Sequence, residues 1–161
     1  MTQEEFLRLY DIHRNTVYRL ALAMLKSVPD AQDVVQNVFV KLLDARIAPQ
    51  PGKERQWLIK VTVNACRDVM RSAWWRNQEP LDENIPFSQP EESAVFHAVM
   101  TLPEKYRLVI HLHYYEGYTC SEIGNLMKIS PSAVSMRLSR ARNMLKSRLE
   151  DEDERLVSKD L

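Results

Sequence analysis

A segment that no helix can cross divides the chain into two parts. Proline occurs three times within residues 77–92, NQEPLDENIPFSQPEE. Proline blocks helix continuation and also pushes the residue before it into extended backbone. The 161-residue chain has only three glycines, so helices are favoured elsewhere over a turn-rich β fold. These features predict an all-α protein of two small helical domains, residues 1–76 and 93–149, joined by an acidic, proline-containing linker at 77–92.

Charge is distributed in blocks, although the formal net charge is zero. Residues 1–76 hold 12 Lys/Arg against 8 Asp/Glu, and residues 105–149 hold 8 against 2, so their net charges are +4 and +6. Residues 77–104 carry −6, and residues 150–161 carry −4. We expect the last block to be a disordered acidic tail. Two separated basic blocks indicate a polyanionic partner contacted at two places; solvated faces without a partner explain the charges equally well.

Hydrophobic patterning and breaker residues predict seven helical segments. They are residues 4–26, 30–44, 54–76, 91–101, 104–115, 120–127 and 131–149.

The last two segments resemble a DNA-binding helix pair. Thr119 and Glu122 have the spacing of a capping box, which stabilises a helix start by ~1 kcal/mol. Ser130 can cap the following helix, with Pro131 at its first position. A short helix, a tight turn and a longer helix make a helix-turn-helix.

The last helix carries the candidate DNA contacts, with Ser132, Met136 and Ser139 on the face opposite Val134 and Ser135 and Arg140 beside them. Arg140 can read a guanine edge, whereas Arg137, Arg142 and Lys146 can reach phosphates. Small or flexible residues near the helix start allow entry into a major groove; these are Ser132, Ser135, Met136 and Ser139. The alternative is an ordinary helical hairpin with a solvated basic face. The two caps, the spacing and the charge favour DNA binding.

Two further helix faces carry candidate contacts. In the third segment, basic side chains alternate with aromatic ones, a pattern suited to binding unpaired nucleic acid. The candidate set is Trp57, Lys60, Asn64, Arg67, Arg71 and Trp75. The alternative is that the tryptophans pack in the core. In the second segment, an exposed valine among polar residues is a mild protein-contact signal; that set is Asp33, Gln36, Asn37 and Val40. An ordinary amphipathic helix is the alternative there.

Several functional classes are disfavoured. No apolar run approaches the ~20 residues of a membrane span, and the acidic N-terminus is unlike a signal peptide. Cys66 and Cys120 stand far apart without a CxxC motif, as expected for a cytoplasmic protein with reduced thiols. No P-loop, HExxH or GxSxG motif is present, which argues against an enzyme. His111 and His113 diverge by about 200° on a helix and cannot share a metal. We expect no metal, cofactor or small-molecule substrate.

Three stretches in order resemble bacterial sigma factors of the extracytoplasmic-function class, which keep only sigma domains two and four. Residues 30–42, DAQDVVQNVFVKL, resemble the polymerase-binding helix. Residues 57–71, WLIKVTVNACRDVMR, are similar to the promoter-melting segment, and residues 102–145 to the C-terminal DNA-binding domain. The resemblance implies a transcription initiation factor. The alternative is a stand-alone helix-turn-helix regulator whose N-terminal helical domain dimerises or senses a signal.

The resemblance also implies roles for individual residues. Asp33 and Gln36 match positions that grip the clamp coiled coil of core RNA polymerase, and the flap is a second polymerase contact. Asn64 matches a position that captures a flipped base of the minus-ten element, in a pocket shaped by residues 48–54. The helix from Pro131 matches the reader of the minus-thirty-five element. The linker would run through the active-site cleft of the polymerase, and an anti-sigma factor is a further partner of this class.

Four features depart from the family pattern. Asn37 stands where an acid is usual, and the loop 48–54, APQPGKE, is unusually rich in proline. Lys128 replaces the turn glycine, where left-handed backbone would cost ~1 kcal/mol more than for glycine. Gly124 replaces the usual alanine of the first helix in the motif.

Overall fold

The computed structural model describes residues 1–72 and 90–159, with side chains for 1–72 and 95–151. The chain separates into two compact units, Met1–Ile85 and Pro86–Leu161, which are described in turn. Both are built from helices in their described parts, so the all-α prediction is confirmed. Most of the expected linker lies outside the described residues.

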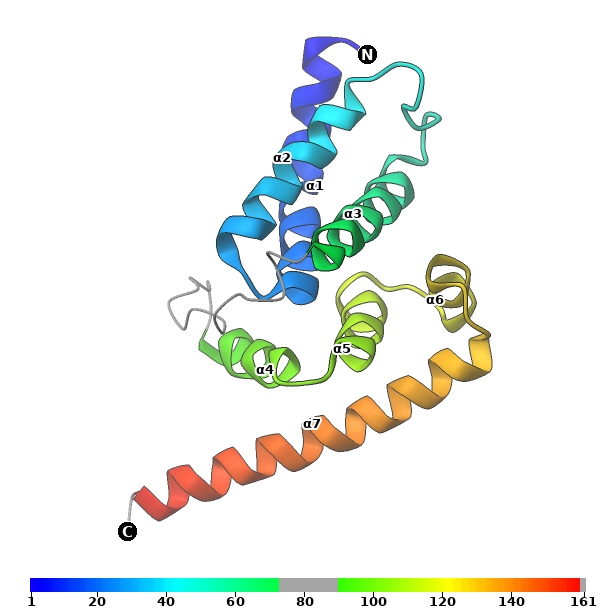
Figure 1. Cartoon of the computed structure of the whole chain (residues 1–161). Coiled ribbons are helices and arrows are strands. Elements are labelled where there is room, and N and C mark those ends of the chain that lie inside the picture. Colours follow the sequence, from blue (N-terminus) through cyan, green and yellow to red (C-terminus); the bar gives the residue numbers. More distant parts are fainter. Residues whose placement is uncertain (73–89, 160–161) are drawn as a thin grey trace. The chain divides into compact units, whose positions relative to one another are not determined.

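Unit 1 contains three helices, α1 (Gln3–Leu25), α2 (Val28–Leu42) and α3 (Glu54–Arg71). Helix α1 packs against both α2 and α3 (Figure 1). A capping box of Thr2 and Glu5 begins α1, and Ser27 caps α2 through the backbone N–H of Asp30 at 3.3 Å. The core is aliphatic, as amphipathic helices require; its members include Val17, Leu20, Leu25, Val34, Val38, Leu42, Leu58, Ile59 and Val63.

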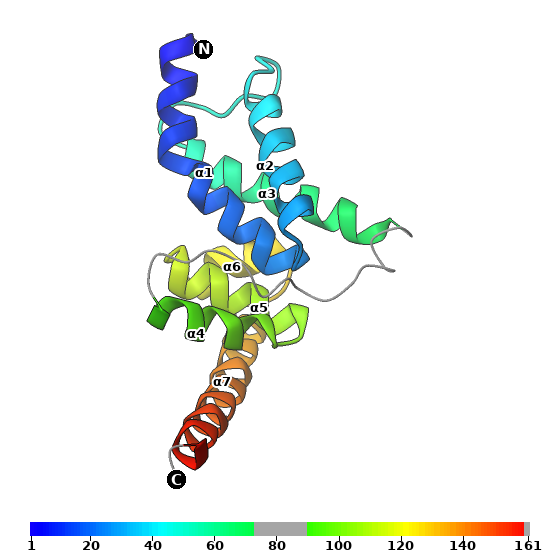
Figure 2. The same ribbon diagram turned by 90° about the vertical axis from the view of Figure 1, so that its left-hand side faces the viewer.

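Unit 2 contains α4 (Pro90–Met100), α5 (Glu104–Ile110), the π-helical turn η2 (His111–Tyr115), α6 (Cys120–Met127) and α7 (Pro131–Lys159). Helices α4, α5 and α6 all pack against α7, whose C-terminal part projects beyond them (Figure 2). Its core includes Val99, Leu102, Val109, Leu112, Ile123, Val134, Leu138 and Ala141. The predicted segment 104–115 therefore forms, but its last turn is wider than an α-helix.

Two predicted boundaries are wrong. Helix α3 ends at Arg71 instead of residue 76, because Ser72 is extended and its hydroxyl donates to the Val69 carbonyl at 2.8 Å, which competes with the helix. Helix α7 continues to Lys159, where a disordered tail was expected from residue 150. No glycine or proline follows Pro131 in the sequence, and the segment is rich in good helix formers, so nothing local stops the helix.

The helix-turn-helix caps form as predicted. The Thr119 hydroxyl accepts from the backbone N–H of Glu122 at 3.1 Å, and the Ser130 hydroxyl accepts from that of Ala133 at 3.1 Å. Lys128 adopts the left-handed conformation, with φ 61° and ψ 43°. The turn between α6 and α7 is therefore made with a lysine in a backbone conformation that favours glycine.

Candidate functional sites

The exposed face of α2 presents the four residues expected to bind protein. Asp33, Gln36, Asn37 and Val40 are all exposed, and 61% of Val40 is accessible. On the opposite side, Val34 and Val38 are buried. Val40 is not one of the buried core residues of unit 1, so its exposed apolar surface is available to a partner.

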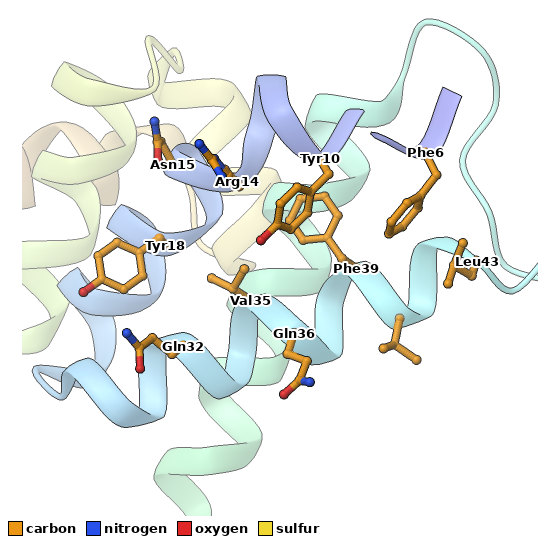
Figure 3. A pocket seen from close by; sticks show the side chains of 11 residues that line it. Phe6, Tyr10, Arg14, Asn15, Tyr18, Gln32, Val35, Gln36, Phe39 and Leu43 are labelled. Atoms are coloured by element: carbon orange, nitrogen blue, oxygen red, sulfur yellow. The ribbon is translucent and has the colours of Figure 1, made fainter. Parts of the chain in front are cut away.

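A groove of about 540 Å³ lies beside this face, between α1 and α2 (Figure 3). Gln36 and Val40 line it together with an aromatic cluster from both helices. The rings of Tyr10 and Phe39 meet edge to face at 4.9 Å, and the Phe6 ring lies 6.4 Å from each of them. The groove joins the polar face of α2 to an aromatic surface.

Sequence reasoning missed the contribution of α1 to this groove. Phe6, Tyr10, Arg14 and Tyr18 recur every four residues, a spacing that places them on one stripe of a helix. The guanidinium of Arg14 lies over the Tyr10 ring, 5.7 Å from its centre. The periodic aromatic stripe was the available signal, and its exposed side shares the groove with α2.

A small pocket of about 250 Å³ lies where the loop before α3 meets that helix. Trp57, half-buried, and Lys60, exposed, come from the predicted basic and aromatic face. The other lining residues are Pro49, Gln50, Lys53 and Gln56. Of these, Gln56 was missed by the sequence analysis. The pocket thus combines an indole ring, two amides and two cations.

The loop beside this pocket is held by its own hydrogen bonds. The backbone N–H of Lys53 donates to the Gln50 carbonyl at 3.0 Å, and Gly52 has a positive φ of 87°. The pKa of Glu54 is lowered because its carboxylate accepts hydrogen bonds from its own backbone N–H and from that of Gly52. These bonds give the proline-rich loop a defined shape at the pocket edge.

The rest of the predicted α3 face is more dispersed. Asn64 is exposed and lies one turn beyond Lys60, outside the set of residues that lines the pocket. Arg67 is half-buried, and Arg71 pairs with Asp68 at 3.2 Å. Trp75 lies outside the described residues. The structure therefore brings Trp57 and Lys60 together at a pocket, but not Asn64.

The DNA-binding candidates of α7 are largely exposed. Ser132, Ser135, Met136 and Ser139 are accessible near the helix start, and Arg137 is half-buried. Arg140 is exposed, and its guanidinium beside the Tyr106 hydroxyl of α5 is the main cause of a lowered pKa of that hydroxyl. The Arg140 side chain thus lies near α5.

Arg142 has a tyrosine partner of its own. Its Nε donates to the hydroxyl of Tyr114 in η2 at 2.5 Å. Sequence reasoning identified the arginine but neither Tyr106 nor Tyr114, because these contacts join residues far apart in the chain.

A second groove, of about 530 Å³, lies between α4, η2 and α7. Its floor is mostly apolar and includes Val95, Val99, Ile110, Leu145 and Leu149. Arg142, Lys146 and Glu150 supply charges along its α7 side. An apolar groove with a charged edge suits the apolar face of a partner helix.

Neither a metal cluster nor a membrane-spanning helix is found in the part of the chain that the structure describes. His111, one of the histidines considered above, instead faces Glu116, with Nε2 and Oε1 3.3 Å apart. The Nδ1 of His113 lies 2.8 Å from the Tyr118 carbonyl oxygen.

Comparison with known families finds two matches. The model of Sigma-70 region 2 matches residues 9–76, and that of Sigma-70, region 4 matches residues 98–147. The first match covers the domain that the stand-alone regulator hypothesis would assign to dimerisation or sensing, so that alternative is not favoured.

Curated relatives are similar over most of this chain. The probable RNA polymerase sigma factor RfaY of Xanthomonas campestris is 29% identical, over 91% of this chain and 41% of its own length. The ECF RNA polymerase sigma factor SigE of Mycolicibacterium smegmatis is 28% identical, over 85% of this chain and 58% of its own. The ECF RNA polymerase sigma factor SigW of Bacillus subtilis is 27% identical, over 92% of this chain and 91% of its own length. The chain thus spans about half the length of the first two relatives and nearly all of the third.

Solved structures share the fold. The sigma factor RpoE of Bartonella quintana, solved in complex with the anti-sigma factor NepR, has a TM-score of 0.77 at 18% identity. The match covers 91% of this chain and 98% of the RpoE chain. CnrH, solved in complex with the cytosolic domain of CnrY, has a TM-score of 0.64 at 25% identity. The match covers 93% of this chain and 90% of CnrH.

Proposed function

Because the chain belongs to the extracytoplasmic-function class of sigma-70 factors, with regions 2 and 4, we propose that it binds core RNA polymerase and directs it to promoters. It then promotes opening of the DNA. The polymerase performs the polymerisation, in the cytoplasm, and this chain contributes no covalent chemistry of its own.

The exposed face of α2 carries this proposal, because it is the feature that a DNA-binding regulator alone would not need. Asp33, Gln36 and Asn37 supply polar contacts, and Val40 supplies an accessible apolar side chain one turn beyond Gln36. Protein interfaces commonly combine polar and apolar side chains in this way. We assign it to the clamp coiled coil of the polymerase.

The pocket beside α3 supports a role in minus-ten recognition. A base leaves its stack at a cost of a few kcal/mol, which the protein must return by stacking and hydrogen bonds. The Trp57 ring can stack, and the amides of Gln50 and Gln56 offer both donors and acceptors. Lys60, Arg67 and Arg71 follow along the helix and can hold the phosphates of the displaced strand, with Asn64 among them.

Helix α7 is assigned to the minus-thirty-five element. Its exposed serines and Met136 stand at the end that enters the major groove in helix-turn-helix proteins. Arg140 is the candidate base reader, and Arg137, Arg142 and Lys146 are candidate phosphate contacts.

Two protein partners are proposed in addition to the clamp. The apolar groove between α4, η2 and α7 suits the flap of the polymerase. An anti-sigma factor is the second, because the solved structure of RpoE, which has the same fold, contains the anti-sigma factor NepR.

Reconstituted transcription tests the proposal. Purified core polymerase is incubated with genomic DNA fragments, with and without the full chain, and the RNA 5′ ends are mapped. We expect new transcripts from a small set of start sites that share upstream sequences. If the chain neither binds core polymerase nor adds any start site, the proposal is wrong.

A further inference from the structure

Tyr114 and Arg142, 28 residues apart in the chain, form a pair with two kinds of contact. The Nε of Arg142 donates to the tyrosine hydroxyl at 2.5 Å. The guanidinium carbon also lies 5.7 Å from the centre of the Tyr114 ring, within the range of a cation–π contact. The hydroxyl and the ring together restrict a side chain that would otherwise sample many rotamers.

The position of Tyr114 is set by the interior of unit 2. It lies in the π-helical turn η2, in which the backbone N–H of Glu116 donates to the His111 carbonyl at 3.2 Å, five residues earlier. The His111 and Glu116 side chains, 1% and 5% exposed, also face each other across this spacing, at 3.3 Å. Isolated π-helical turns are rare and are often found at functional sites. Tyr114 is itself 56% exposed, and it lies in the chain between the two members of the buried pair.

Arg142 lies on a stripe of α7 that begins at the candidate DNA-reading end. At 100° per residue, Ser135, Ser139, Arg142 and Lys146 fall within about 60° of one another. All four are exposed. Arg142 stands about 10 Å further along the axis than Ser135. When the helix start is in the major groove, a cation at that distance can reach the phosphates that border the groove.

In this pair, the N–H groups at the end of the Arg142 guanidinium can still bind a ligand. Tyr114 takes the Nε donor, and this bond does not use the end-on pair of N–H groups carried by the two terminal nitrogens. Two parallel N–H groups match two oxygens of a phosphate. An arginine already held in place loses less rotamer freedom when it binds.

We propose that Tyr114 is a positioning residue for DNA binding, which holds Arg142 ready for a backbone phosphate. The proposal rests on the proposed function to the extent that it assumes α7 binds DNA. The competing assignment is that the pair serves only the wall of the apolar groove, which both residues line.

A double-mutant cycle tests it. Fluorescence anisotropy measures binding of the full chain to a labelled duplex of about 25 base pairs, over a series of salt concentrations. The set is the unmodified chain, Tyr114→Phe, Arg142→Ala and the double variant. We expect Arg142→Ala to lower the salt slope by about one, because one phosphate contact is lost. Tyr114→Phe should weaken binding about two- to tenfold with little change in slope, because the contact is still made but must be ordered on binding.

The decisive result is the absence of any further loss when Tyr114→Phe is added to Arg142→Ala. Tyr106→Phe is the matched control, since it removes a tyrosine hydroxyl that lies near Arg140 and not near Arg142; the change should weaken binding by the same factor with and without Arg142. Thermal unfolding of each variant checks that the fold is kept.

Four outcomes would overturn the proposal. They are an unaltered affinity of Tyr114→Phe, an equal loss in both backgrounds, an unchanged slope for Arg142→Ala, and no duplex binding by the unmodified chain at low salt. Because this assay contains no polymerase, its failure is distinguishable from failure of the proposed function, which is judged by polymerase binding and transcript mapping.

Discussion

The backbone N–H of Ile129 donates to the carbonyl oxygen of Gly124 at 3.0 Å, and the two residues approach so closely that a Cβ at position 124 would lie 2.6 Å from the Ile129 oxygen. The obstacle is backbone, which cannot rotate away as a side chain can. Glycine is therefore required at position 124, because the backbone of the helix-turn-helix turn passes too close to leave room for a Cβ.

Gly124→Ala should destabilise unit 2 despite the better helix propensity of alanine. Relieving the contact should cost about 1–3 kcal/mol, against a gain of ~1 kcal/mol in propensity. We expect a net loss of ~1 kcal/mol in the free energy of unfolding, measured with urea. Asn125→Ala, at an exposed position of the same helix, is the control and should be neutral or slightly stabilising. An increase in stability for Gly124→Ala would contradict this reading of the turn.

Lys128→Gly should stabilise unit 2 by ~1 kcal/mol, because Lys128 has φ 61° and glycine adopts this conformation without a Cβ penalty. Lys128→Ala removes the same charge but keeps the strain, so it should give no such gain. Both free energies of unfolding are measured by urea denaturation. If Lys128→Gly and Lys128→Ala are equally stable, relief of backbone strain at position 128 does not stabilise unit 2.

The double change Asp33→Ala and Gln36→Ala should weaken binding to core polymerase at least tenfold, with little effect on thermal unfolding. Both side chains are exposed, so their removal leaves the core of unit 1 intact. Affinity is measured by fluorescence titration of the labelled full chain with core enzyme. Asp11→Ala, an exposed acid on α1, controls for the loss of a negative charge. A double variant that binds as tightly as the parent would remove α2 from the polymerase interface.

Trp57→Ala should impair DNA opening more than closed-complex formation, because its ring is the stacking surface of the pocket beside α3. Loss of base stacking costs about 1–3 kcal/mol, and a template with a pre-melted bubble should restore much of the activity. Permanganate footprinting of the minus-ten region compares the two templates.

Asn64→Ala, tested in parallel, should have a smaller effect, since Asn64 does not line the pocket. If the asparagine variant is the more defective, base capture takes place further along α3.

Stability of unit 1 should fall on acidification through a contribution from His13. Its pKa is lowered, first by burial and then by Arg55, while Glu54 opposes the shift. The folded state therefore resists protonation, whereas the unfolded chain takes up a proton as the pH falls below about 6.5. The free energy of unfolding should decline there, and His13→Gln should remove part of the decline. Urea unfolding at pH 7.5 and 5.5 measures the free energy of unfolding of the parent and of His13→Gln. If the two proteins differ in this free energy by the same amount at both pH values, His13 does not contribute to the decline.

Local patterns predicted the elements of this fold well, for a physical reason. Capping boxes, prolines and apolar stripes act between residues at most four apart, so Thr119 with Glu122 and Ser130 with Pro131 could be interpreted from order alone. The same patterns misjudged the two helix ends at Arg71 and beyond residue 149. There, a serine side chain bond and the mere absence of a breaker determined the outcome, and neither has a strong periodic signal.

The sequence by itself determined which helices form, where the exposed polar faces lie, and that two basic modules flank an acidic segment. The tertiary structure alone decided which of those surface residues have partners. Arg142 is bonded to Tyr114, Arg140 lies near Tyr106, and the pocket of Trp57 is completed by the loop before it. The two arginine contacts depend on how helices distant in the chain pack against each other, and the pocket depends on the shape of a loop. Hydrophobic periodicity specifies which face of a helix is buried, but neither which neighbour it meets nor how a loop folds.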